Sequence, residues 1–159
     1  PEIVDILRPY PHWPAGGVTA RIEDLLIYGQ QMYSSSYDIH STKKSLLKPA
    51  TIKEMWTYHN PNVSITKESM KIFNKTIHNI KYRYVMGWER REFPSNVEHD
   101  QSILNNLIYL SHTGSIGSAN AKLAIFPSLN FTFAIIANHG SLNNQMDRLV
   151  IESLNYLFA

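Results

Sequence analysis

The residues best suited to chemistry are His112, Thr113, Gly114 and Ser115, a run that ends a predicted strand and leads into a glycine-containing turn. An imidazole, a hydroxyl and open backbone amides can bind a carbonyl oxygen or a carboxylate, because glycine lets a ligand approach the main chain. Imidazole also titrates near neutral pH, where it can exchange protons with a substrate. The His-Thr-Gly triplet at 112–114 alone leaves open a simpler alternative, in which the segment is a turn with a surface histidine.

No other group of side chains in the sequence indicates a site of this kind. The remaining histidines have no metal-binding spacing and the chain has no cysteine, so we expect no metal, no other cofactor and no disulfide. In the proline-rich loop near the N-terminus, His12 and Trp13 either border a cleft or simply pack. Trp56 and Trp88 are expected in the core, and Arg90-Arg91 is expected to be a solvated strand end.

The composition is that of one folded domain. The 159 residues are 43% hydrophobic and 11% aromatic, which is enough for an apolar core. With 15 basic and 13 acidic residues the formal charge is +2. A charge this small excludes the classes of protein that bind nucleic acid or membrane surfaces through a strong positive charge. No apolar run approaches the roughly 18 residues of a membrane span. Three glycosylation sequons, at Asn62, Asn74 and Asn130, leave secretion open as an alternative.

The periodicity of apolar residues predicts an α+β fold, with an antiparallel sheet covered by helices. Helical spacing predicts helices over about 21–33, 48–56 and 144–157. Ser34-Ser35-Ser36 is expected to end the first helix, and Pro49 lies near the start of the second, where proline is tolerated. Aromatic and β-branched runs predict strands over 82–89, 106–113, 122–126 and 131–137. The last two form a predicted hairpin, and residues 60–80 fit either a surface helix or an ordered insertion.

Several spaced motifs, read in order, resemble those of the serine β-lactamase-like family. That family groups class C β-lactamases, penicillin-binding proteins and related esterases and peptidases. The motifs are Ala-Gly-Gly at 15–17, Asp-Leu-Leu at 24–26, Leu-Lys-Pro at 47–49, the run 84–88, His112-Thr113-Gly114 and Ala137-Asn138. The resemblance covers about residues 12–158, and the animal mitochondrial members are the most similar.

The resemblance implies that residues 1–159 are the C-terminal portion of a single β-lactamase-related domain, with the β-lactamase/transpeptidase-like fold. Family members use a serine nucleophile in Ser-x-x-Lys, a base in Tyr-x-Asn and a strand with Lys-Thr-Gly or His-Thr-Gly. Two formal matches to the first two motifs are interpreted as coincidences. Ser41-Thr42-Lys43-Lys44 lies in a polar linker, and Tyr58-His59-Asn60 falls after the Leu-Lys-Pro segment, where the family does not place its base. The nucleophile-bearing part is therefore expected to be missing.

The family roles are transferred position by position. His112 would orient the base and attract a substrate carboxylate, and Thr113 would hydrogen-bond that carboxylate. Gly114 would keep the strand edge open, while the amide of Ser115 would donate to the oxyanion. The implied catalytic residues are thus His112 and Ser115, and the implied substrate-binding residues are Thr113, Gly114 and Asn138, the last near the rim of the site.

The implied activity is that of a serine hydrolase, a peptidase or esterase that works through an acyl-enzyme and of which this fragment alone is inactive. The expected partners are the N-terminal portion of the same protein, a peptide or ester substrate, and further copies in a homo-oligomer or filament. An isolated half would also expose sheet edges and apolar surface, which favours a partner chain. A catalytically silent scaffold is the alternative. The resemblance suggests a mitochondrial location.

Overall fold

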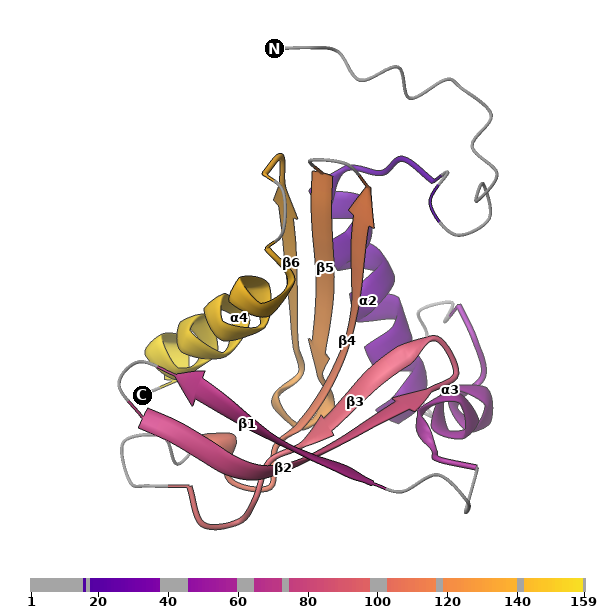
Figure 1. Cartoon of the computed structure of the whole chain (residues 1–159). Coiled ribbons are helices and arrows are strands. Elements are labelled where there is room, and N and C mark those ends of the chain that lie inside the picture. The colour runs from indigo at the N-terminus through magenta and orange to yellow at the C-terminus, as the bar shows by residue number, and fades with distance from the viewer. Residues whose placement is uncertain are drawn as a thin grey trace.

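The computed structural model describes residues 16, 18–37, 46–59, 65–72, 75–97, 103–116, 119–139 and 142–158. Within these ranges six strands form one antiparallel sheet, in which each strand pairs with the next along the chain (Figure 1). The strands are β1 (Thr66–Ile72), β2 (Lys75–Val85), β3 (Trp88–Glu92), β4 (Ile108–Ile116), β5 (Ala119–Phe126) and β6 (Phe131–Ala137). The helices are α2 (Ile22–Tyr37), α3 (Pro49–Trp56), the short 3-10 helix η2 (Pro127–Leu129) and α4 (Asn143–Phe158). The predicted α+β class is confirmed.

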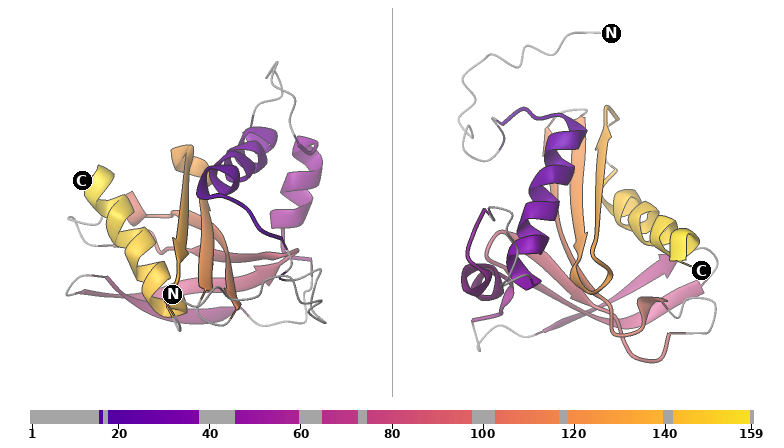
Figure 2. Two further views of the ribbon diagram at one scale, coloured as in Figure 1. Left: turned by 90° about the horizontal axis from the view of Figure 1, so that it is seen from above. Right: turned by 180° about the vertical axis from the view of Figure 1, so that it is seen from behind.

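Helices cover the two faces of the sheet separately. The sheet bends so that β1, β2 and β3 cross beneath β4, β5 and β6 (Figure 1). The helix α4 lies on one side of the sheet and α2 lies with α3 on the other (Figure 2). Accordingly α2 packs against β5, β6 and α3, whereas α4 contacts β1 and β5. None of the helices in the described part of the chain is long and apolar enough to cross a membrane.

Each side of the sheet has its own apolar core. The α4-side core includes Tyr109 and Phe126, whose rings stack with centroids 5.0 Å apart, together with Val150 and Leu154 of α4. The α2-side core is built from the buried residues Met32, Ile52, Trp56, Val85, Trp88, Leu110, Leu123 and Ile125. Trp56 and Trp88 are only 6% and 4% exposed, so their predicted place in the core is confirmed.

The segment over 60–80 differs from the helical alternative, because its described residues form β1 and β2. A β-bulge explains why apolar residues of this segment, such as Ile77 and Ile80, are spaced as in a helix. Glu68 pairs with Ile80 and Met70 with Ile77, so β2 carries one extra residue, and Asn79 there has a φ of 62°. The bulge places Ile77 and Ile80 in one buried row although they are three residues apart, which imitates a helical period.

The predicted boundaries agree with the structure for α3 and at the C-terminal end, and they differ at the end of α2 and at the β2–β3 turn. The hairpin of β5 and β6 and the terminal helix α4 are confirmed. The predicted single strand over 82–89 is instead a tight hairpin that turns at Met86-Gly87, where Gly87 has a φ of 73°. The helix α2 continues through the three serines to Tyr37, since serine disfavours a helix only modestly.

Candidate functional site

His112 lies on an open edge of β4. The strand β3 pairs with β4 from Ile108 to Ser111 only, while β5 pairs with β4 as far as Ile116. From His112 onward, the edge of β4 that faces away from β5 therefore has no partner strand among the described residues. His112 is exposed, and it pairs across the ladder with Leu123 of the α2-side core, so its side chain points to that side.

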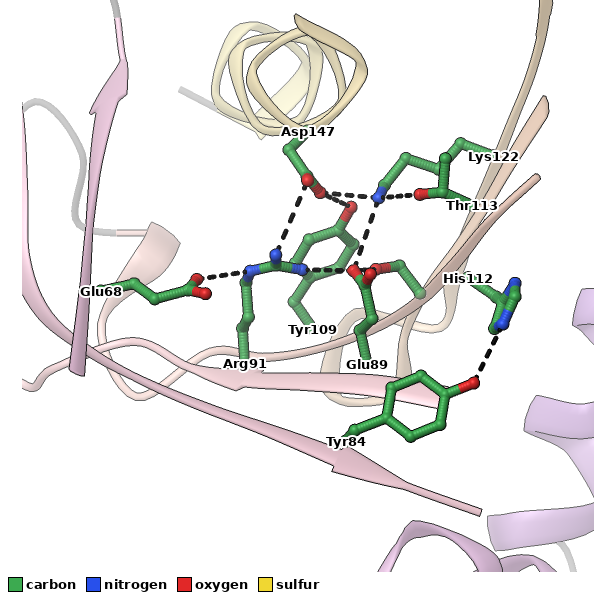
Figure 3. Close-up of polar contacts among 10 residues, drawn as sticks. Glu68, Tyr84, Glu89, Arg91, Tyr109, His112, Thr113, Lys122 and Asp147 are labelled. Carbon is green, nitrogen blue, oxygen red and sulfur yellow. Dashed lines mark hydrogen bonds and ion pairs between the residues drawn. The ribbon is translucent and has the colours of Figure 1, made fainter. Parts of the chain in front are cut away.

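The imidazole of His112 has one close polar partner, the hydroxyl of Tyr84. The distance from Tyr84 Oη to His112 Nε2 is 3.1 Å, and the two rings meet edge to face with centroids 6.2 Å apart. The side chain of Tyr84 reaches His112 from β2, as Figure 3 shows. This hydrogen bond restrains the orientation of the imidazole, and it is compatible with either tautomer because a phenolic hydroxyl both donates and accepts.

A cavity of about 460 Å³ lies beside His112 on the same side of the sheet. Its wall includes Leu25 and Tyr28 of α2, Met55 of α3, Met86 of the β2–β3 turn, and His112 and Gly114 of β4. A Cβ atom added to Gly114 would meet no atom within 4 Å. Glycine therefore leaves open space at this point of the wall.

The opposite face of β4 holds a buried charged network. Lys122 is fully buried, with its Nζ 2.8 Å from Asp147 Oδ1 of α4, 2.9 Å from Thr113 Oγ1 and 3.8 Å from Glu89 Oε2. The hydroxyl of Tyr109 donates to Asp147 Oδ1 at 2.8 Å. Figure 3 shows these groups meeting beneath α4, away from His112.

Arg91 completes the network and corrects the expectation of a solvated strand end. Its side chain is 9% exposed and lies 3.1 Å from Glu68, 2.8 Å from Glu89 and 3.7 Å from Asp147. Burial disfavours the charge of Arg91, but these carboxylates outweigh that effect and raise its pKa above the usual value. Burial, together with the charge of Asp147, also raises the pKa of Tyr109 well above its ordinary value of 10.0.

The structure brings some of the predicted site residues together and separates others. His112, Gly114 and Ser115 are all exposed on the same stretch of β4. The hydroxyl of Thr113 is turned toward Lys122, on the face away from His112. Asn138 is exposed just after β6, and β5 lies between it and Ser115.

The formal motif matches are placed as follows. The residues 41–44, as well as His12, Trp13 and Asn60, lie outside the described ranges. The ring of Tyr58 lies under the guanidinium of Arg83, at 5.4 Å, and His59 Nε2 lies 2.8 Å from the carbonyl oxygen of Glu54.

Sequence reasoning missed Tyr84 as a neighbour of His112 and missed the charged network. One local signal pointed to the network. Lys122 is the one charged residue of β5 and directly precedes the apolar run 123–126, and Asp147 is an acid beside the apolar stripe of the terminal helix. Opposite charges at two core-facing positions indicate a buried pair, because an unpaired charge is too costly to bury.

The described residues contain no group of three or more His, Cys, Asp or Glu that is arranged to hold a metal ion. Comparisons with protein-family models, with curated proteins and with solved structures find no match for this chain.

Proposed function

We propose that this chain is the C-terminal part of a serine hydrolase of the β-lactamase-like type, with the β-lactamase/transpeptidase-like fold, that acts on a peptide or ester through an acyl-enzyme. The observation that carries the proposal is the exposed imidazole of His112, which shares a hydrogen bond with Tyr84 on an open strand edge beside a cavity. Such an imidazole is accessible to a substrate and is held in one orientation, as proton transfer requires.

In this proposal the strand β4 forms one wall of the active site. His112 orients the base and attracts a carboxylate of the substrate. The amide of Ser115 donates a hydrogen bond to the oxyanion that develops during acyl transfer. Gly114 lets the substrate approach the strand. Since the hydroxyl of Thr113 already contacts Lys122, Thr113 acts on the substrate only if its side chain turns; otherwise it anchors the strand.

The nucleophile then comes from an N-terminal portion of the same protein. The edge strand β6 supports a partner of this kind, because in the described sheet it pairs only with β5. It carries seven residues without a charge, and Ile136 is 48% exposed. Uncharged edge strands of this length are normally covered in folded proteins.

A second candidate is a catalytically silent interaction module, a component of a homo-oligomer or filament. It is favoured by apolar side chains exposed at the end of α4, where Tyr156 and Leu157 are 84% and 58% exposed. Exposed apolar groups that lie next to one another mark interaction surfaces.

Fluorophosphonate labelling separates the two candidates. The protein is purified from its natural source, labelled, and each chain is weighed by denaturing mass spectrometry. An adduct on a Ser-x-x-Lys serine of a longer or companion chain supports the hydrolase. Absence of any adduct contradicts the hydrolase and favours the silent module.

The role of His112 is tested by the turnover of the unlabelled protein, because a fluorophosphonate adduct blocks the nucleophile, and a matched control variant is included. His112→Ala should slow turnover by about 100-fold or more, the usual contribution of a positioned acid or base. His78→Ala is the control, because His78 is also exposed on a strand and also shares a hydrogen bond with a hydroxyl, that of Ser69 at 2.9 Å. Equal activities of the two variants would refute the role of His112.

A further inference from the structure

The cavity beside His112 has an apolar wall on the side away from β4. The helix α2 contributes Leu25 and Tyr28, the helix α3 contributes Met55, and the β2–β3 turn contributes Met86. Among the described residues, no carboxylate lines the cavity. Lys122 contributes to the wall, but its ammonium group lies on the other face of the sheet, bound to Asp147 and Thr113. Within the described part of the lining, His112 is therefore the one basic side chain whose polar atoms a ligand in the cavity can reach.

The large side chains at this cavity are partly open to solvent. Met86 is 53% exposed and Tyr28 is 41% exposed. Methionine is flexible and polarizable, so Met55 and Met86 can adapt their shape to an apolar group that enters between them. A volume of about 460 Å³ falls in the range of small-ligand sites and accommodates one side chain with part of a main chain.

The polar groups lie at one end of this apolar wall. His112 and Gly114 are on β4, whose outer edge is unpaired from His112 onward in the described part of the sheet. An extended main chain beside that edge can use its free backbone groups. Its alternate side chains then point toward the side of the sheet that carries the cavity.

From this placement we infer that the cavity is a subsite for an apolar side chain, of the size of leucine, methionine or phenylalanine, in a peptide or ester bound along β4. This inference rests on the proposed function and names the substrate class of the same site. Apolar side chains are preferred over acidic ones, because the described walls offer Met55, Met86 and Leu25, and the ammonium group of Lys122 lies on the other face of the sheet.

Methyl NMR of the whole chain tests the subsite without requiring activity. The protein has five methionines, and each is labelled with ¹³C at its methyl group. Met55 and Met86 line the cavity, whereas Met70 packs on the α4-side core and Met146 lies on α4, so these two serve as internal controls. The probes are N-acetyl-leucinamide and its acidic counterpart, the α-amide of N-acetyl-aspartic acid.

The leucine probe should shift the signals of Met55 and Met86 in a saturable way and bind about tenfold more tightly than the aspartate probe. No shift at these two methyl groups, equal shifts at Met70 and Met146, or tighter binding of the aspartate probe would overturn the inference.

Two variants and a matched control sharpen the test. Gly114→Leu should fill the open space at the wall, and Met86→Lys should place a charge at the rim; each should weaken the leucine probe about tenfold or more. Leu149→Lys is the control, because Leu149 of α4 is 50% exposed, much as Met86 is. Equal weakening in Leu149→Lys and Met86→Lys would contradict the subsite.

The subsite and the hydrolase fail in different ways. A fluorophosphonate adduct without a response of Met55 and Met86 removes the subsite and leaves the hydrolase. A saturable response of these methionines without any adduct removes the hydrolase, and the cavity then remains a binding site for apolar side chains.

Discussion

Removing the ammonium group of Lys122 should be among the most damaging single changes in this fold. Lys122→Met keeps the length and volume of the side chain while deleting its charge. In the native network Glu68, Glu89 and Asp147 face two cations, Arg91 and Lys122. The variant leaves three carboxylates facing one cation, and it removes the group that lies 2.8 Å from Asp147.

The expected loss in the free energy of unfolding is about 3 kcal/mol. Breaking a buried ion pair by removing one partner costs roughly 3–5 kcal/mol. The low end applies because Glu68 and Glu89 keep side-chain exposures of 32% and 23%, so that water still screens part of their charge. A domain is stable by only about 5–15 kcal/mol, so this loss is readily measured.

Urea unfolding followed by tryptophan fluorescence measures the effect, because Trp56 and Trp88 are buried. Arg148→Gln is the control. It breaks an ion pair with Glu152 on the surface of α4, where Arg148 is 51% exposed, and it should cost less than about 0.5 kcal/mol.

A double-mutant cycle tests the charge argument itself. Adding Asp147→Asn to Lys122→Met removes the excess carboxylate, so the double variant should be more stable than the sum of the single losses by about 0.5–3 kcal/mol. The reasoning is refuted if Lys122→Met costs less than about 1 kcal/mol, or if the two losses simply add.

Three further predictions concern the packing and titration of single residues. The raised pKa of Tyr109 stabilises the fold fully below pH about 10, and this contribution is lost as the pH rises toward the folded-state pKa, because the unfolded chain releases the phenol proton first. The urea midpoint should therefore fall above pH about 10. It should fall less steeply in the Tyr109→Phe variant. Gly29→Ala should lower the thermal midpoint by an amount that corresponds to about 1–3 kcal/mol, since a Cβ there would lie 2.5 Å from Thr132 Cγ2; Thr132→Ser should restore most of the loss, and a Gly29→Ala variant as stable as the wild type would contradict this packing. Gly87→Ala should cost about 1–2 kcal/mol through the backbone alone, because φ is 73° and no atom lies within 4 Å of the new Cβ; Gly87→Asn should cost less in the same unfolding experiment.

The sequence was sufficient for elements whose signals are local. Pro49 at the first turn marks α3, and the turn residues 127–130 between two apolar runs mark the hairpin of β5 and β6. The bulge at Asn79 and the turn at Gly87 were missed, because each breaks the period of two on which strand prediction relies.

The candidate site was predictable only in part for the same reason. The run from His112 to Ser115 is contiguous, so composition and position on a strand end point to it. The partner of His112 is Tyr84, 28 residues earlier, and the partner of Lys122 is Asp147 on another element. Such pairs depend on how the sheet bends, which no local pattern encodes. Strand alternation alone, however, implies that Thr113 points away from His112.

The two faces of β4 constrain each other through the strand register. A slip of β4 by one residue would move every side chain to the opposite face. The imidazole of His112 would then enter the cationic part of the network, and the hydroxyl of Thr113 would enter the apolar cavity. Since Lys122 contacts Thr113 and Asp147 at under 3 Å, the network disfavours that slip strongly. Apolar packing alone would distinguish the two registers less, because Tyr109 and Leu110 are both buried, on opposite sides of the sheet. The buried charges thus hold the open face of β4, with His112 and Gly114, beside the cavity.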